Sequence, residues 1–468
     1  MTSVTGGQAL VQALKAEGVE VIFGVPGTQN LPIFDALVDE PAIRLIANRH
    51  EQGSGYMADG YARASGRPGV VVTVSGPGAL NAMPALGQAY SDSSPVLLVS
   101  SQVNAASLDR DAEDFHQLRD AARVFQSVTK WQGRARSVAA IPGLVRAAFQ
   151  ELCSGRPRPV YLEIPQDVLF ASGNAEPLPA RPVGPLEPAA GLVERAAEIL
   201  GSAQRPVFYV GGGAIHAGAG ETIMTLAERL QAPVVVSPNG KGAVAESHPL
   251  VVGSGWGAHQ VGNAIIEQAD VCLALGTRFG PYATSYWKLR FPRLIHVDAD
   301  HAELGKQYQP EVGIVADARL AARSLVDALD RRGFAASEAC WVDVAAHRLE
   351  RRLAIEDHAG GDHRTGQATA ANFVRPGDAA KTKIAEPALD RRHLGDARQL
   401  REERAQDFLG LSPVSFRRCV RLCRGDPGGS RASRDGHDHG VRPRYDQSKV
   451  NREETSAPRR SRRRLCAP

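Results

Sequence analysis

The first 170 residues alternate between short apolar runs and segments with the spacing of helices. Apolar runs at 19–25, 43–47, 69–75 and 96–100 are short and rich in β-branched residues, which predicts strands. Small-residue segments at 53–64 and 79–91 follow two of these runs and predict helices. Strand, turn, helix and strand in succession are typical of a parallel sheet with crossover helices. The pattern therefore predicts an α/β domain over residues 1–170.

Three of the predicted strands end in segments that suit a ligand site. The ends are Pro26-Gly27, Glu51 and the turn Gly76-Pro77-Gly78. In parallel sheets ligands bind beyond the carboxyl ends of the strands, so we expect these segments to converge on one crevice. A lone Glu at a strand-to-helix junction is more often a solvated first-turn residue that the helix dipole stabilises. Glu51 becomes a candidate functional residue because of the segments around it.

A second α/β unit follows a linker. Residues 171–188 are rich in Pro and Ala and predict an interdomain linker. Runs at 206–210, 233–236, 271–275 and 294–298 predict strands, and 220–230 and 261–268 predict helices, giving a central domain over 189–335. The run Val210-Gly-Gly-Gly213 lacks the third glycine of a dinucleotide fingerprint, because position 216 is His, and no acidic residue follows at the right distance. These observations exclude a nicotinamide-dinucleotide site of that kind.

The charge balance changes after residue 360. The chain holds 55 basic and 51 acidic residues. Residues 361–468 contain 24 of the basic and 14 of the acidic ones, so residues 1–360 contain 31 basic and 37 acidic residues. The tail is Arg-rich and has no apolar periodicity. A frame-shifted or truncated gene product, a nucleic-acid-binding tail and a divergent domain all remain open. Because its basic clusters have no interleaved aromatic residues, nucleic-acid binding is the weaker alternative.

Short motifs over the first 335 residues carry a family resemblance. These segments are Gly24–Gly27, Arg49–Gly53, Ser75–Gly78 with Asn81, Tyr90–Pro95, Gly155–Pro157, Ile164–Asp167, Gly240–Gly242 and Leu275–Phe279. In these segments the chain resembles thiamine-diphosphate-dependent enzymes of the acetolactate synthase and pyruvate oxidase type. The resemblance implies a thiamine-diphosphate-binding fold followed by a Rossmann-like central domain.

The resemblance also implies an activity and a set of site residues. In this family a Glu at the position of Glu51 hydrogen-bonds N1′ of the cofactor's aminopyrimidine ring and so activates the thiazolium for decarboxylation or carboligation of a 2-oxo acid. His116, at the mouth of the site, is open as an acid or base or as a surface imidazole. The residues implied to bind cofactor are Pro26, Gly27, Glu51, Thr73, Gly76, Pro77, Asn81, Gln117 and Arg156.

Two further cofactors depend on segments that depart from the family pattern. The family binds Mg²⁺ through Gly-Asp-Gly and a later Asn in a third domain, but Gly377-Asp378 precedes Ala379 and Gly425-Asp426 precedes Pro427. We therefore expect residues 336–468 to be a degenerate tail, with activity impaired; a non-catalytic remnant that acts through partners is the alternative. FAD is open, because Arg156, the 253–262 loop and Gly276–Phe279 resemble FAD-contacting segments, whereas Gly280-Pro281 replaces an acidic pair.

Cysteine use and the family resemblance complete the expectations. Cys153, Cys272 and Cys340 are predicted to be core thiols, and a metal site of tail Cys and His residues (Cys419, Cys423, Cys466, His437, His439) is a weak possibility. No disulfide framework, signal peptide or spanning segment is visible, so we expect a cytoplasmic protein with no membrane partner. The family implies a homodimer or homotetramer with helix 53–64 at its interface, and a small 2-oxo acid as substrate.

Overall fold

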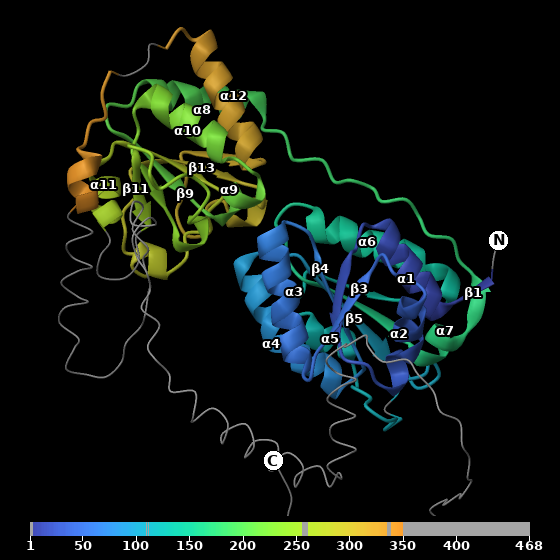
Figure 1. Ribbon diagram of the computed structural model, residues 1–468. Coiled ribbons are helices and arrows are strands. Elements are labelled where there is room, and N and C mark those ends of the chain that lie inside the picture. The colour runs from blue at the N-terminus through green and yellow to red at the C-terminus, as the bar shows by residue number, and fades with distance from the viewer. Residues whose placement is uncertain (1–2, 109, 111, 255–260, 335–337, 350–468) are drawn as a thin grey trace, which may run out of the picture. The chain divides into compact units, whose positions relative to one another are not determined.

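The computed structural model describes residues 3–108, 110, 112–254, 261–334 and 338–349. Figure 1 shows two α/β domains in this part of the chain, joined by a long extended segment. The expectations for residues 350–468, including the tail Cys and His residues and the two Gly-Asp sequences, lie outside the described residues. Most of the 253–262 loop lies outside them as well.

The first domain is built on a six-stranded parallel sheet in the order β3-β2-β4-β5-β7-β6. Helices α3, α4 and α5 cover one face of the sheet, and α1, α2, α6 and α7 cover the other. Buried β-branched residues on both faces are typical of such a sheet. The strands are β2 Val21–Gly24, β3 Arg44–Ala47, β4 Gly69–Thr73, β5 Val96–Gln102, β6 Trp131–Arg134 and β7 Val160–Pro165. The helices are α1 Gly6–Ala16, α2 Leu31–Val38, α3 Glu51–Ser65, α4 Pro77–Asp92, α5 Ala121–Phe125, α6 Ile141–Cys153 and α7 Gln166–Phe170.

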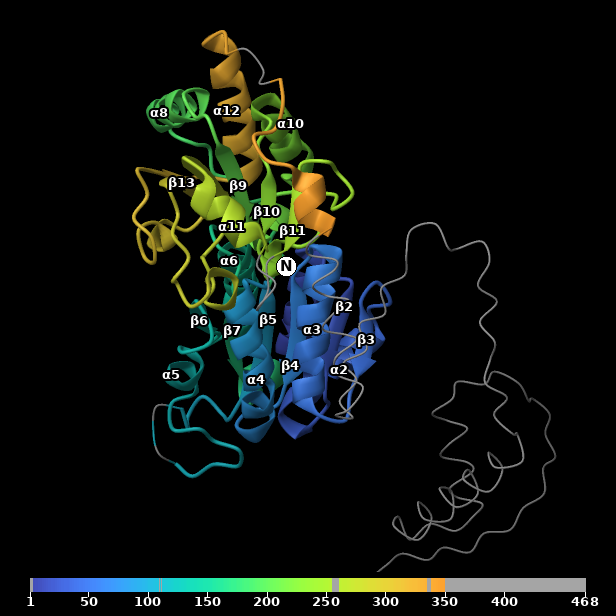
Figure 2. The same ribbon diagram turned by 90° about the vertical axis from the view of Figure 1, so that its left-hand side faces the viewer.

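The central domain repeats this architecture. Its six strands are all parallel, in the order β11-β10-β9-β12-β13-β14. Helices α8, α10 and α12 pack on one face of the sheet, and α11 packs on the other (Figure 2). The strands are β9 Pro206–Val210, β10 Val234–Val236, β11 Val251–Ser254, β12 Val271–Leu275, β13 Arg293–Asp298 and β14 Val312–Val315. The helices are α8 Ala190–Gly201, α9 Gly212–His216, α10 Gly220–Leu230, α11 Val261–Gln268 and α12 Ala318–Arg331. The predicted α/β fold with two parallel sheets is confirmed.

The segments that flank the two sheets add structure that the composition does not predict. The start of the expected linker forms a strand, β8 Ser172–Asn174, which pairs antiparallel with β1 Ser3–Thr5. Beyond α12, Trp341 Nε1 donates a hydrogen bond of 2.7 Å to the carbonyl of Pro206, and Val344 is buried in the central core. The chain therefore still packs on the central domain after residue 335.

One core expectation is wrong. Cys272 is fully buried and Cys340 is half-buried, but Cys153 is exposed. Cys153 is the last residue of α6, and its neighbour Leu152 occupies the buried face of that helix. The apolar surroundings in the sequence therefore belong to Leu152 and Phe149.

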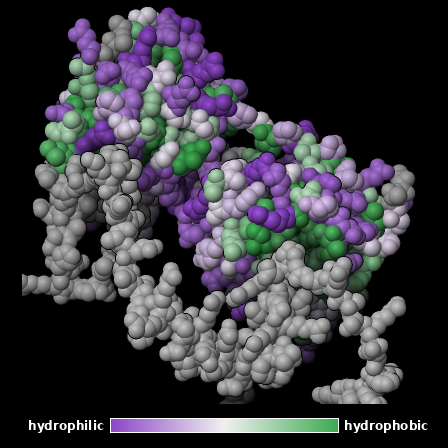
Figure 3. Space-filling model, in the orientation of Figure 1, coloured by the Kyte–Doolittle hydropathy of each residue, from purple (hydrophilic) through white to green (hydrophobic). Residues whose placement is uncertain are grey.

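The visible surface of the described residues is largely hydrophilic, with smaller apolar areas between (Figure 3). Among the helices that the structure describes, none has the length and apolar character needed to cross a bilayer.

Candidate functional site

Glu51 begins helix α3, and three residues separate it from the end of β3. The chain turns at His50, whose backbone is extended and whose Nδ1 accepts a hydrogen bond of 3.2 Å from the Gln52 amide. This side-chain cap satisfies one of the free amides of the first turn. Glu51 is half-buried and lies at the carboxyl edge of the sheet, as predicted.

Asn81 holds the Glu51 carboxylate. Its Nδ2 donates a hydrogen bond of 2.9 Å to Glu51 Oε2. The bond joins α4 to α3, and these helices lie close together because Gly55 of α3 faces Ala85 of α4. A Cβ at Gly78 would lie 3.3 Å from Glu51 Oε1, so glycine leaves space beside the second carboxylate oxygen. One oxygen is thus held by protein, and the other lies in a region without side-chain bulk.

The turn after β4 adds a strained glycine and two unpaired hydroxyls. Gly76 has φ +55°, which favours glycine, and a Cβ there would lie 2.2 Å from the carbonyl oxygen of His116. The side-chain oxygens of Thr73 and Ser75 are buried and have no hydrogen-bond partner. Buried hydroxyls normally have partners, so these two indicate a place where a bound polar group would supply them.

The Pro26-Gly27 turn packs against the same region. The Gly27 amide donates a hydrogen bond of 2.8 Å to Asn30 Oδ1, and Asn30 Nδ2 donates one of 3.1 Å to the carbonyl of Val25. The side chain of Val74 fills the space beside Gly27, where a Cβ would lie 2.6 Å from Cγ1. The same side chain lies beside Gly78, where the corresponding distance to Cγ2 is 2.5 Å. Val74 thus interlocks two of the predicted segments, a role that its apolar character in a strand pattern does not indicate.

Gln117 stabilises its own loop. Its Nε2 donates to the carbonyl oxygens of Ser107 and Arg110, at 2.8 and 2.6 Å, and its Oε1 accepts from the Asp114 amide at 3.0 Å. All its hydrogen-bonding groups therefore have partners within residues 107–117. The loop itself lies against Gly76 through His116.

Arg156 lies away from Glu51, in a pocket between the two domains. Its guanidinium donates to Ser93 Oγ at 2.7 Å and forms an ion pair of 2.6 Å with Glu303 of the central domain. Ser93 caps the carboxyl end of α4, whereas Asn81 lies near its start. Twelve helical residues span about 18 Å, so Arg156 belongs to a separate site.

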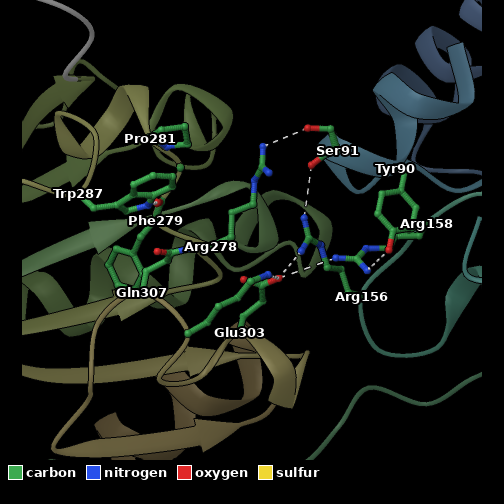
Figure 4. A pocket seen from close by; sticks show the side chains of 12 residues that line it. Tyr90, Ser91, Arg156, Arg158, Arg278, Phe279, Pro281, Trp287, Glu303 and Gln307 are labelled. Atoms are coloured by element: carbon green, nitrogen blue, oxygen red, sulfur yellow. Dashed lines mark hydrogen bonds and ion pairs between the residues drawn. The ribbon is translucent and has the colours of Figure 1, made fainter. Parts of the chain in front are cut away.

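This pocket has a volume of about 310 Å³ and a cationic wall (Figure 4). Arg158 lies 4.3 Å above the Tyr90 ring, and Lys306 pairs with Glu303 at 3.1 Å. Burial lowers the pKa of Arg156 and, close by, raises the pKa of Asp298 to about 6. The lining residues are Tyr90, Ser91, Arg156, Arg158, Arg278, Phe279, Gly280, Pro281, Trp287, Glu303, Lys306 and Gln307.

The structure therefore separates the predicted residues into two groups. Glu51 contacts Asn81 and lies beside Gly78, and Val74 links the turns at Gly27 and Gly78, whereas Arg156 contacts Ser93 and Glu303. Within the described part of the chain, His, Cys, Asp and Glu side chains do not gather into a group that could hold a metal ion. The strand ends around Glu51 offer a carboxyl group, an amide that orients it, and the unpaired hydroxyls of Thr73 and Ser75.

Two family models match separate parts of the chain. Residues 4–124 match the N-terminal TPP-binding domain of thiamine pyrophosphate enzymes. Residues 193–325 match the central domain of the same enzymes.

Individual relatives cover the same part of the chain. A probable acetolactate synthase large subunit of Methanocaldococcus jannaschii is 38% identical over 339 residues, which are 69% of this chain and 56% of the relative. The acetolactate synthase isozyme 1 large subunit of Escherichia coli is 38% identical over 319 residues, 67% of this chain and 56% of the relative. A probable 2-ketoarginine decarboxylase of Pseudomonas aeruginosa is 38% identical over 363 residues, 75% of this chain and 63% of the relative. The matched part thus spans little more than half the length of these relatives.

Proposed function

Because the chain belongs to the thiamine pyrophosphate enzyme family, we propose that its crevice binds the aminopyrimidine ring of thiamine diphosphate. The reaction served would be acetolactate synthase-like decarboxylation or carboligation of a 2-oxo acid. The observation that carries this proposal is the Glu51–Asn81 pair at 2.9 Å, placed beside the turns that follow β2 and β4.

The described residues would divide the work of binding and activation. The Glu51 carboxyl group would share a proton with N1′ of the ring in a hydrogen bond, and Asn81 would keep that carboxyl group in the orientation this bond needs. The unpaired hydroxyls of Thr73 and Ser75 fit polar atoms of the same ring, since both lie at the end of β4. When bound, the cofactor supplies a carbon nucleophile and an electron sink for loss of carbon dioxide. The protein's part is to position the ring and to hold the proton at Glu51.

The described residues bear differently on Mg²⁺ binding and on FAD binding. Hard cations need oxygen ligands, and the described residues hold no group of three or more His, Cys, Asp or Glu side chains that could supply them. The pocket around Arg156 has the cations that a phosphate group prefers. Its volume is about 310 Å³, and most of the 253–262 loop, which resembles an FAD-contacting segment, lies outside the described residues, so the described lining does not assign FAD. No step of the proposed reaction involves FAD.

The substrate class follows from the relatives' names. A probable 2-ketoarginine decarboxylase among them is named for a 2-oxo acid. We propose a small 2-oxo acid as the substrate of this chain, and pyruvate is the first to test.

We further propose that α3 contributes to a homodimer or homotetramer interface. Tyr56 and Met57 of α3 are 44% and 45% exposed, and Gly53 and Gly60 leave the same helix without bulk on its outer side. Exposed apolar side chains next to small residues suit close packing with a second copy. In sedimentation experiments Met57→Glu should shift the chain toward monomer. Val38→Glu, at an 81% exposed apolar residue of α2, is the matched control and should not.

Calorimetric titration of the full chain with thiamine diphosphate tests the cofactor proposal. If only the aminopyrimidine contacts contribute, binding should be about millimolar and Glu51→Gln should weaken it further. Micromolar, Mg²⁺-dependent binding would assign a diphosphate site to residues 350–468. Binding that is the same for Glu51→Gln as for the native chain would contradict the role of Glu51.

A further inference from the structure

The segment Glu163–Asp167, at the end of β7 and the start of α7, has no role in the proposed function, although most of it is a motif of the family resemblance. β7 lies next to β5 in the sheet. β5 ends at Gln102, which pairs with Pro165 of β7, and the chain then enters the loop of residues 103–120. The segment therefore lies beside the point where that loop begins.

Glu163 holds the first bend of the loop. Its side chain is fully buried, and its carboxylate forms an ion pair with Arg134 of β6. The same carboxylate accepts hydrogen bonds from the Tyr161 hydroxyl at 3.0 Å and from Gln102 Nε2 at 3.1 Å. Buried charges need partners of this kind. Because Gln102 Oε1 accepts a hydrogen bond of 3.2 Å from the Val103 amide, the buried network fixes the chain where it leaves β5.

Gln166 and Asp167 hold the next part of the loop. Gln166 Nε2 donates a hydrogen bond of 3.1 Å to Asn104 Oδ1. Asp167 Oδ1 accepts a hydrogen bond of 3.0 Å from the Ala105 amide. Gln166 is half-buried and Asp167 is exposed, so these two bonds form the outer half of the contact. We call Glu163, Gln166 and Asp167 together the loop-base clamp.

The far end of the loop lies against the segments that the cofactor proposal uses. Gln29, which follows the Pro26-Gly27 turn, donates a hydrogen bond of 3.2 Å from Nε2 to the carbonyl of Phe115. The His116 carbonyl fills the space beside Gly76, where a Cβ would lie 2.2 Å from its oxygen. A shift of the loop at its base would therefore be felt at the turn that follows β4.

We propose that the loop-base clamp positions the loop against the Gly76 turn and so keeps the thiamine diphosphate crevice in its binding-competent shape. Glu163, Gln166 and Asp167 are positioning residues, because they act through the loop. The inference rests on the proposed function, since it takes the turn after β4 as the place where the aminopyrimidine ring binds. When the clamp is released, only the fraction of molecules with the loop in place binds the cofactor at full affinity.

The test uses the outer half of the clamp. Glu163→Gln would remove a buried charge that pairs with Arg134 and would destabilise the whole domain, so it is not informative. The double variant Gln166→Ala/Asp167→Ala removes both outer hydrogen bonds from the full chain and leaves the buried network in place. Asp167→Asn keeps an acceptor oxygen for the Ala105 amide and is the conservative variant that should behave like the native chain.

Hydrogen-exchange mass spectrometry of the free chain measures the clamp directly. Amides of residues 103–108 should exchange about tenfold faster in the double variant, the expected effect of losing two hydrogen bonds. The Kd for thiamine diphosphate with Mg²⁺, from an NMR titration of the same samples, should rise about threefold to tenfold. Asp343→Ala, which removes an exposed carboxylate that accepts a hydrogen bond of 3.0 Å from the Ala346 amide, is the matched control and should change neither quantity.

Faster exchange together with weaker cofactor binding in the double variant supports the inference. Unchanged exchange would mean that these hydrogen bonds do not hold the loop, and faster exchange with an unchanged Kd would mean that the loop does not shape the crevice. Either result overturns the inference, and so does an equal loss of affinity in Asp343→Ala, which would assign the effect to general instability. If the native chain does not bind thiamine diphosphate, the proposed function fails and this inference fails with it.

Discussion

Gly55 sets the distance between α3 and α4, and therefore between Glu51 and Asn81. A methyl group at position 55 would lie 2.6 Å from Ala85 Cβ, closer than two such atoms approach. Ala85 has no side-chain torsion that could move its methyl group away, so the helices must separate. Overpacking of this kind costs about 1–3 kcal/mol, and replacing a helical glycine by alanine returns about 0.5–1 kcal/mol. Gly55→Ala should therefore lower the free energy of unfolding by roughly 0.5–2 kcal/mol.

Gly143 of α6 offers a control in another helix. A methyl group there meets no atom within 4 Å, so Gly143→Ala should raise the free energy of unfolding by about 0.5–1 kcal/mol. Urea denaturation followed by circular dichroism would compare the two variants with the native chain. Gly55→Ala should also weaken thiamine diphosphate binding, because separated helices lengthen the Glu51–Asn81 hydrogen bond. If Gly55→Ala proved as stable as Gly143→Ala, the close packing of α3 on α4 would be refuted.

Two further predictions concern the charged groups near the interdomain pocket. Glu303→Gln leaves the half-buried Arg156 guanidinium without its ion-pair partner at 2.6 Å. Calorimetry should therefore show that the free energy of unfolding falls by about 3 kcal/mol or more. Glu311→Gln, which breaks an exposed ion pair with Arg293, is the control and should change the free energy of unfolding by less than about 1 kcal/mol. Burial raises the pKa of Asp298 from 3.8 to about 6. Between pH 3.8 and about pH 6 the folded chain therefore binds a proton that the unfolded chain has released, and the stability of the fold decreases as the pH rises through this range. Asp298→Asn should therefore be more stable than the native chain by up to about 3 kcal/mol in free energy of unfolding at pH 7, and the difference should be small at pH 4. Denaturation at both pH values measures this, and an equal difference at pH 4 and pH 7 would contradict the burial of Asp298.

The strands and the convergence of their ends were accessible from the sequence. The runs at 206–210 and 271–275 coincide with β9 and β12, and the helices at 220–230 and 261–268 coincide with α10 and α11. Short β-branched runs bounded by Gly, Pro or Asp are strong local signals. The rule that ligands bind at the carboxyl ends of parallel strands then placed Glu51 beside the turn at Gly76.

The details of the crevice depend on contacts between distant residues and could not be predicted. Val74 interlocks Gly27 and Gly78, and the His116 carbonyl occupies the space beside Gly76, forty residues earlier in the chain. Arg156 pairs with Glu303, which lies 147 residues away. The local sequence shows an arginine in a loop, and only the packing of two domains shows that this arginine holds them together. Side-chain interlocking of this kind leaves no periodic signal.

Saturation-transfer NMR of the full chain with thiamine diphosphate tests most directly whether the Glu51 crevice binds the aminopyrimidine ring. The method detects complexes of about millimolar affinity and distinguishes the protons of the two rings. We predict strong transfer to the pyrimidine protons and weaker transfer to the thiazolium side chain, with the pyrimidine signal greatly reduced in Glu51→Gln. Glu20→Gln, at an exposed carboxylate before β2, should leave the transfer unchanged. Equal transfer to the pyrimidine protons in Glu51→Gln and in the native chain would contradict the account.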